Sequence, residues 1–241
     1  MHFMEGSLPI GWCIFWAALS APFIIYGIWK LTRMIKENRR VLPLLAVTGA
    51  FLFVISVLHI ETPSGCSHVT GAGLPTAFFG PGITSVISLI VVMLQALLLA
   101  HGGLTTMGAT VFSMGIAGPL AAWLVFKGMR KTGKAGLGIS IFVMSIVANL
   151  VTCIVASLEF ALAYTDYGTV ALFISSCSSL FIATLIGYSL VQIPVAIIDG
   201  VVCSLIAIYI VRVKPDILKK LGIIKDDEIA KIQHKAEKDS R

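Results

Sequence analysis

The first two residues of the chain, Met1 and His2, carry nitrogen donors in an order that suits a metal ion. The α-amine of Met1 and the amide nitrogen of His2 close a five-membered chelate ring on a metal. The same amide and the imidazole Nδ1 close a six-membered ring. Together the two residues offer three nitrogens in one plane, and an imidazole from elsewhere would complete a square. Square-planar nitrogen ligands suit Ni(II) or Cu(II), and low-spin Co(II) also accepts them, whereas Zn(II) prefers a tetrahedron.

This chelate requires a free amine on a retained Met1. Methionine is normally removed only before a small residue, and the large His2 therefore predicts retention. The alternative interpretation of the MHFMEG terminus is an exposed, frayed end. A secretory signal peptide ending near residue 20 is disfavoured, because Glu5 is acidic and no Lys or Arg precedes the apolar run.

The fourth nitrogen has to come from another of the five histidines. His68 lies in a polar stretch over 61–82, and His59 lies at the end of the apolar run before it. With the N-terminus outside the membrane, this placement favours His68 and then His59. His101 and His234 are expected on the cytoplasmic side, at the inner end of an apolar run and in the polar tail.

Cys66 stands two residues before His68 and is a further candidate ligand or nucleophile. A small loop residue is the ordinary interpretation of a cysteine in this position. The other four cysteines form neither a CxxC pair nor a disulfide framework, and they are read as buried apolar residues.

Composition indicates that lipid is the main solvent of this chain. Of its 241 residues 57% are hydrophobic and 12% are charged, whereas soluble domains carry about 25% charged residues. The apolar runs are long enough to cross a hydrocarbon core of about 30 Å, and they lack the alternation of a β-barrel. We therefore expect an all-α polytopic membrane protein with about seven transmembrane helices. They are predicted over 10–31, 41–60, 83–100, 105–127, 137–163, 169–190 and 192–213.

Basic residues between 30 and 40 predict that this turn is cytoplasmic, with the N-terminus outside and the C-terminus cytoplasmic. We expect one transmembrane domain over 1–213 and a cytoplasmic tail over 214–241. The stretch 61–82 is rich in Gly, Pro, Ser and Thr, and is expected to be an outer loop without regular structure that folds over the site. One feature conflicts with this topology, because the helix count places a basic stretch over 127–134 outside. Either a span has been missed or two spans pair irregularly.

Five polar residues lie in or near the apolar runs, where such groups usually face the bundle interior. We interpret them first as hydrogen-bond partners between helices. They are Gln95, Asn149, Glu159, Gln192 and Asp199. The sequence contains no GxxxxGK[ST] phosphate loop, so any ATP hydrolysis has to come from a partner.

Several motifs in order carry a family resemblance: MHFMEG, SGCSHVTGAGL, QALLLAHGGLTTMGA, FSMGIAGP and QIPVAIIDG. Together they resemble the CbiM/NikM family, the substrate-specific (S) membrane subunits of energy-coupling-factor transporters for cobalt and nickel. The resemblance covers residues 1–213. It implies a six-helix S-component core with an extra N-terminal helix, in the cell membrane of a prokaryote.

The resemblance also implies a site. Its ligands would be the Met1 amine, the amide and imidazole of His2, and the imidazole of His68. The MHxMEG start is similar to the cobalt branch, whereas nickel members more often read MHIPDG, so Co(II) is the expected transported substrate and Ni(II) the alternative. No organic cofactor is expected. Three neighbouring residues are expected to hold the terminus and loop by hydrogen bonds: Glu5, Ser67 and Thr70.

The resemblance further implies partners. They are a transmembrane coupling subunit (CbiQ-like), ATPase subunits (CbiO-like) and the small membrane component CbiN. Ala46 and Ala50 form a small-xxx-small pair that resembles the coupling-subunit docking motif, although such pairs also pack helices within one chain. The chain is not expected to be an enzyme. Two rivals remain: a self-sufficient metal channel or secondary transporter, and a membrane enzyme using Cys66 and His68.

Overall fold

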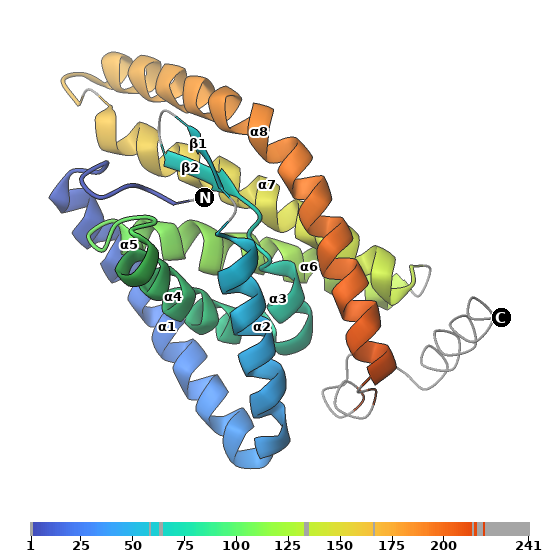
Figure 1. Ribbon diagram of the computed structural model, residues 1–241. Helices are drawn as coiled ribbons and strands as arrows, with labels where there is room; N and C mark the ends of the chain where they lie inside the picture. The colour runs from blue at the N-terminus through green and yellow to red at the C-terminus, as the bar shows by residue number, and fades with distance from the viewer. Residues whose placement is uncertain are drawn as a thin grey trace.

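The structure is a computed structural model that describes residues 2–57, 59–62, 65–132, 135–165, 167–213, 215 and 219. It consists of helices with one two-stranded hairpin (Figure 1), which confirms the all-helical polytopic class. The elements are α1 (Ile10–Glu37), η1 (Arg39–Val41), α2 (Leu42–Ile55), β1 (His59–Thr62), β2 (Gly65–His68), α3 (Gly73–Phe79), α4 (Pro81–Leu99), α5 (Met107–Thr110), the π-helix η2 (Val111–Ala117), α6 (Gly118–Thr132), α7 (Leu137–Tyr164) and α8 (Val170–Val213).

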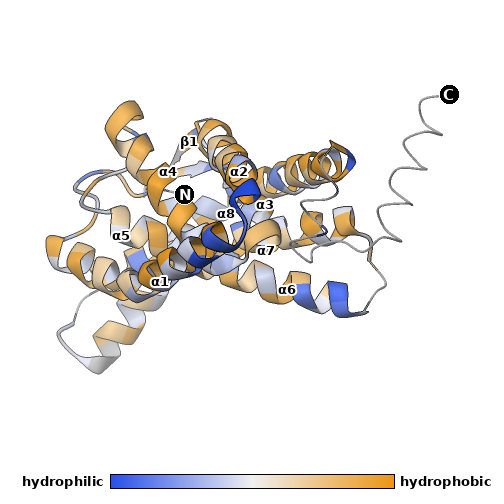
Figure 2. Cartoon of the chain, turned by 90° about the horizontal axis from the view of Figure 1, so that it is seen from below, coloured by the Kyte–Doolittle hydropathy of each residue, from blue (hydrophilic) through white to orange (hydrophobic). Residues whose placement is uncertain are grey.

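Five helical stretches in the described part of the chain are long and apolar enough to cross a bilayer by length and composition. Three expected ranges take a different form, one as α2 and two as α8. The helix α2 has 14 residues, about 21 Å of rise. The helix α8 has 44 residues, about 66 Å, and joins the spans expected over 169–190 and 192–213. In Figure 2 apolar residues cover most helices, and hydrophilic residues are concentrated at a few ends, among them the end of α6.

The stretch 61–82 has regular structure, contrary to the predicted irregular outer loop. The strands β1 and β2 pair antiparallel, with His59 opposite His68. The chain then forms α3, in which every residue is buried. Because the α3 side chains Leu74, Phe78 and Phe79 belong to the main apolar cluster, this part of the chain turns back into the protein instead of covering a surface.

The chain reverses direction between α3 and α4. Gly80 is the single residue between these two helices and caps both of them. Its φ of 80° is in the left-handed region that favours glycine. Pro81 then begins α4 at a position where no helical N–H is lost. The Lys30 Nζ donates to the Phe79 carbonyl at 3.5 Å. The reversal therefore lies at the basic end of α1, and α4 runs back toward the end of the molecule where the N-terminus lies.

This reversal removes the charge conflict of the predicted topology. A Cβ atom on Gly80 would lie 3.2 Å from the Lys30 Nζ and 4.0 Å from the Trp123 Nε1. The Lys127 Nζ lies 4.8 Å from the centroid of that Trp123 ring. Lys30 and Lys127, one from each basic stretch, thus both lie near Trp123, at the end of the bundle away from the N-terminus. Which membrane face that end occupies stays a prediction.

Candidate metal site

The N-terminal segment is inserted into the protein and fixed by Phe3. The Phe3 side chain is 2% exposed, and burial of such a side chain contributes about 1.5–3 kcal/mol. Its carbonyl accepts hydrogen bonds from the Gly103 N–H at 3.0 Å and the Thr106 hydroxyl at 2.9 Å. Its own N–H donates to the Thr110 hydroxyl at 3.4 Å. These contacts fix the position of the preceding residue, His2.

The backbone of His2 forms a bridge with β2. The His2 N–H donates to the Cys66 carbonyl at 3.3 Å, and the Cys66 N–H donates to the His2 carbonyl at 3.1 Å. The terminus is thereby added to the hairpin beside β2. Because His68 follows two residues after Cys66, its side chain lies on the same face of β2, as does His2 across the bridge.

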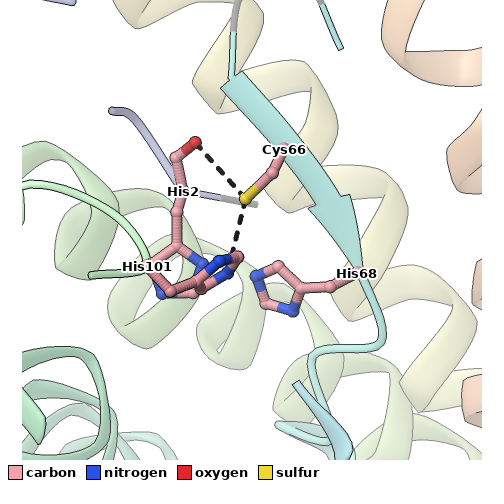
Figure 3. A group of neighbouring side chains, drawn as sticks. All are labelled: His2, Cys66, His68 and His101. Carbon is pink, nitrogen blue, oxygen red and sulfur yellow. Dashed lines mark hydrogen bonds between the residues drawn. The ribbon is translucent and has the colours of Figure 1, made fainter. Parts of the chain in front are cut away.

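Four buried side chains converge here: His2, Cys66, His68 and His101 (Figure 3). Each offers one ligand atom, and these atoms all lie within 4.8 Å of one another. The His2 ring centroid is 4.5 Å from that of His68 and 4.6 Å from that of His101. The group combines the N-terminus, the hairpin and the turn after α4, and it has the donor set of a transition-metal site.

The structure corrects the placement of His101, which was predicted on the opposite side from His2. Because α4 runs toward the N-terminus, its end delivers His101 to the cluster. Ala100, with a φ of 50°, ends the helix in the left-handed conformation. Gly102, with a φ of 81°, passes so close to His2 that a Cβ atom there would lie 3.0 Å from the His2 Cδ2.

Burial keeps the three imidazoles neutral. It lowers the pKa of His2 and of His68 well below 6.5, and neighbouring imidazoles lower both further. Burial, followed by the adjacent His59, lowers the pKa of His101 to about 4. Since a metal binds the neutral imidazole, protons compete weakly for these ligands at neutral pH.

The hydrogen bonds of the imidazoles indicate which ring nitrogens have a lone pair available for a metal ion. The His68 Nδ1 lies 2.9 Å from the Val69 carbonyl. A carbonyl only accepts, so the neutral ring carries its proton on Nδ1 and its lone pair on Nε2. Both ring nitrogens of His2 are buried and lack a hydrogen-bond partner among the described residues. The Cys66 Sγ lies 3.4 Å from the His101 Nε2 and 3.8 Å from the His2 carbonyl oxygen.

The other predicted site residues have different surroundings. The His59 ring is exposed, lies 4.1 Å from the His101 ring between centroids, and has its Nδ1 2.9 Å from the Val57 carbonyl. Glu5 accepts hydrogen bonds from the Thr105 hydroxyl at 2.5 Å and the Thr105 N–H at 3.3 Å. It therefore ties the terminus to the turn after α4. Met1 lies outside the described residues.

Ser67 and Thr70 connect the hairpin to α8 through a buried polar network. The Ser67 hydroxyl donates to the Gln192 side-chain oxygen, and the Thr70 hydroxyl donates to Asp199 at 3.2 Å. Asn149 of α7 donates to Asp199 and accepts from Gln192 at 2.6 Å. These three intramembrane residues are hydrogen-bond partners between elements, as the sequence predicts.

Gln95 and Glu159 are also buried. The Gln95 amide donates to the Ser56 hydroxyl, which connects α4 to the end of α2. Both carboxylate oxygens of Glu159 lack a hydrogen-bond partner within the described ranges. Ala46 and Ala50 lie at the surface and line an apolar groove between α2 and α4.

A multi-pass helical protein with a buried imidazole and thiol cluster has the features of a membrane component of a metal transporter. Comparison with known proteins identifies the component. Residues 2–217 match the CbiM family model, described as "Cobalt uptake substrate-specific transmembrane region". The chain belongs to the CbiM family.

Relatives extend over the whole chain. A protein of Methanocorpusculum labreanum with the provisional name cobalt transport protein CbiM 2 is 63% identical over 237 residues, covering 98% of this chain and 100% of its own length. A protein of Methanosphaerula palustris with the same provisional name is 46% identical, covering 96% of each chain.

Solved structures share the fold. A crystal structure of a transition metal transporter matches with a TM-score of 0.73 and 22% identity, covering 92% of this chain and 98% of the other. A truncated transition metal transporter matches with a TM-score of 0.71 at 22% identity, covering 88% and 98%. At this identity the likeness establishes the helical arrangement alone.

Proposed function

We propose that this chain is the substrate-binding membrane subunit of an ATP-driven importer of Co(II). It captures the ion with the Met1 amine, the amide and imidazole of His2, and the imidazole of His68. One observation carries the proposal: the His2 imidazole is buried beside His68, and neither of its ring nitrogens has a hydrogen-bond partner among the described residues. A bound ion would supply the missing partner. Ni(II) accepts the same planar nitrogens and is the alternative cargo.

Binding through the His2 amide changes one hydrogen bond. The amide nitrogen has to lose its proton, so its bond to the Cys66 carbonyl is given up. The second bond of the bridge, from the Cys66 N–H to the His2 carbonyl at 3.1 Å, survives and keeps the terminus paired with β2. In the proposal, Glu5, Ser67 and Thr70 keep the two ligand-bearing segments in position.

Energy for import comes from partners, because the chain lacks a phosphate loop. We propose a CbiQ-like coupling subunit, CbiO-like ATPase subunits and a CbiN-like small membrane component. The exposed Ala46 and Ala50 support docking of the coupling subunit at the groove between α2 and α4. The proposed cytoplasmic tail, 214–241, lies almost wholly outside the described residues.

The terminal amine is tested by placing Gly-Ser before Met1. This extension leaves every side chain intact but removes the amine from its chelating position. We expect Co(II) and Ni(II) affinities to fall at least about 100-fold, because loss of a ligand should exceed the 10–100-fold effect of losing a ligand's hydrogen-bond support.

The matched control adds Gly-Ser after Arg241. Metal content and Co(II)/Ni(II) competition are measured on purified protein in detergent, and the competition identifies the preferred cargo. Unchanged affinity for both ions in the N-terminally extended form would reject the amine chelate.

A further inference from the structure

We infer that the same pocket has a second coordination mode, made by side chains alone: three imidazoles, from His2, His68 and His101, and the thiolate of Cys66. This set takes a tetrahedral divalent ion of the Zn(II) class and needs neither the terminal amine nor the His2 amide. The inference rests on the proposed metal-binding role of the pocket but not on the amine chelate.

The spacing of the four ligand atoms supports this mode. A tetrahedral ion with a metal–sulfur distance of about 2.3 Å and a metal–nitrogen distance of about 2.0 Å separates sulfur from nitrogen by roughly 3.6 Å. The Cys66 Sγ and the His101 Nε2 are 3.4 Å apart. All four ligand atoms are within 4.8 Å of one another, so modest side-chain rotations bring them onto one ion.

The backbone supports it as well. In this structure the His2 N–H donates a hydrogen bond to the Cys66 carbonyl and the amide is not a ligand, whereas the His2 ring nitrogens lack hydrogen-bond partners among the described residues. With the bridge intact, the side chains are the donors available. A metal can bind in this mode when the Cys66 thiol loses its proton, without deprotonation of an amide.

The two modes favour different ions. Thiolate and imidazole in a tetrahedron select Zn(II), whereas four planar nitrogens disfavour it. The N-terminal chelate then acts as a selectivity device: it raises affinity for Co(II) and Ni(II) above a background affinity for Zn(II) that the side chains provide. Blocking the amine should therefore change the ion preference instead of abolishing binding.

The test uses the Gly-Ser-extended and native proteins, each loaded with Zn(II) or Co(II). We expect the extended form to bind Zn(II) within about tenfold of the native affinity, since it keeps all four side-chain ligands. Its Co(II) complex should show the visible spectrum of tetrahedral Co(II) and a sulfur-to-metal charge-transfer band. Cys66→Ser should remove that band, whereas Cys13→Ser, at a thiol buried elsewhere, should keep it.

The outcomes separate this inference from the proposed function. An extended form that binds no ion overturns the inference and leaves the amine chelate standing. An extended form that binds without the charge-transfer band overturns the thiolate role. If the native protein binds no ion either, the metal site itself fails. X-ray absorption of the native chain with Zn(II) needs no variant, and absence of a sulfur neighbour at about 2.3 Å would also reject the inference.

Discussion

At the scale of single residues, burial of the His2 imidazole costs free energy. Its two ring nitrogens are buried without hydrogen-bond partners among the described residues, and each such group costs about 1–3 kcal/mol. The hydrogen bonds of the next residue, Phe3, with the Thr106 and Thr110 hydroxyls hold it there. A ligand ion offsets this cost, so binding should stabilise the fold as well as fill the site.

The pKa of His101 gives a prediction for the metal-free protein. The folded pKa is about 4 and the unfolded pKa is about 6.5, so between these values the unfolded chain binds more protons. Stability is therefore complete above about pH 6.5 and is lost as pH falls toward about 4. Thermal denaturation in detergent between pH 7 and pH 4.5 measures this loss. His101→Asn should reduce the pH dependence, and an unchanged dependence would contradict the assignment.

Three of the four clustered residues are candidates from the sequence, because Cys66 is already named there as a possible ligand beside His68. The chelate argument selects His2, and the expected side of the membrane selects His68; the structure brings these two together, although their role as ligands stays a prediction. The predicted position of His101 is wrong because the predicted topology lacks the reversal of the chain through α3. The basic stretch over 127–134 was the available signal, since one more reversal before α4 would have placed both basic stretches together and His101 beside His68.

At the scale of elements, hydrophobic periodicity does not identify helices that are short or that follow a polar segment. The helix α3 has seven residues, includes Pro75 and follows a turn-rich stretch, so nothing in its pattern distinguishes it from a loop. The single helix α8 contains Pro194, which made a boundary between two spans a reasonable prediction. Long transmembrane helices tolerate proline because neighbouring groups satisfy the freed carbonyl.

The groove between α2 and α4 gives the element-scale prediction. Ala46→Leu with Ala50→Leu should fill the groove and weaken assembly with the proposed coupling subunit, because small residues permit close helix approach in lipid. Co-purification of the complex from membranes measures assembly. Val47→Leu is the matched control, since Val47 is exposed on the same helix and lies outside the groove lining. Intact assembly of the double variant would exclude this docking surface.

At the scale of the whole molecule, the polar network joins the hairpin to two long helices. Asp199 accepts hydrogen bonds from Thr70, from the Gly71 N–H at 3.1 Å, and from Asn149. The hairpin strand that carries Cys66 and His68 is thus tied to both α7 and α8. The candidate metal site and the helix packing depend on the same hydrogen bonds, so a change in one should be measurable in the other.

Asp199→Asn tests this connection with almost no change in shape. Both carboxylate oxygens of Asp199 accept hydrogen bonds, whereas the NH2 group of an asparagine would face these same donors and could not accept from them. We expect the free energy of unfolding to fall by about 1–3 kcal/mol and metal affinity to fall by about 10–100-fold. Thermal denaturation and metal titration measure the two effects.

The control for this substitution is Thr184→Val on the same helix. The Thr184 hydroxyl donates to the Leu180 carbonyl at 2.8 Å and the Phe181 carbonyl at 3.1 Å, both of α8. Because these bonds stay within α8, the Thr184→Val substitution should leave metal affinity unchanged. A folded Asp199→Asn protein with native affinity would show that the network supports packing alone.

The bonds of the N-terminal segment also set an order of events during biosynthesis. His2 pairs with Cys66 and Phe3 with Thr110, so the residues that leave the ribosome early have partners that are synthesised much later. The site cannot close until the chain has been translated beyond Thr110 and the first helices have been inserted. Until then the His2 imidazole is not yet buried, and the four side chains of the cluster are not yet gathered around one position.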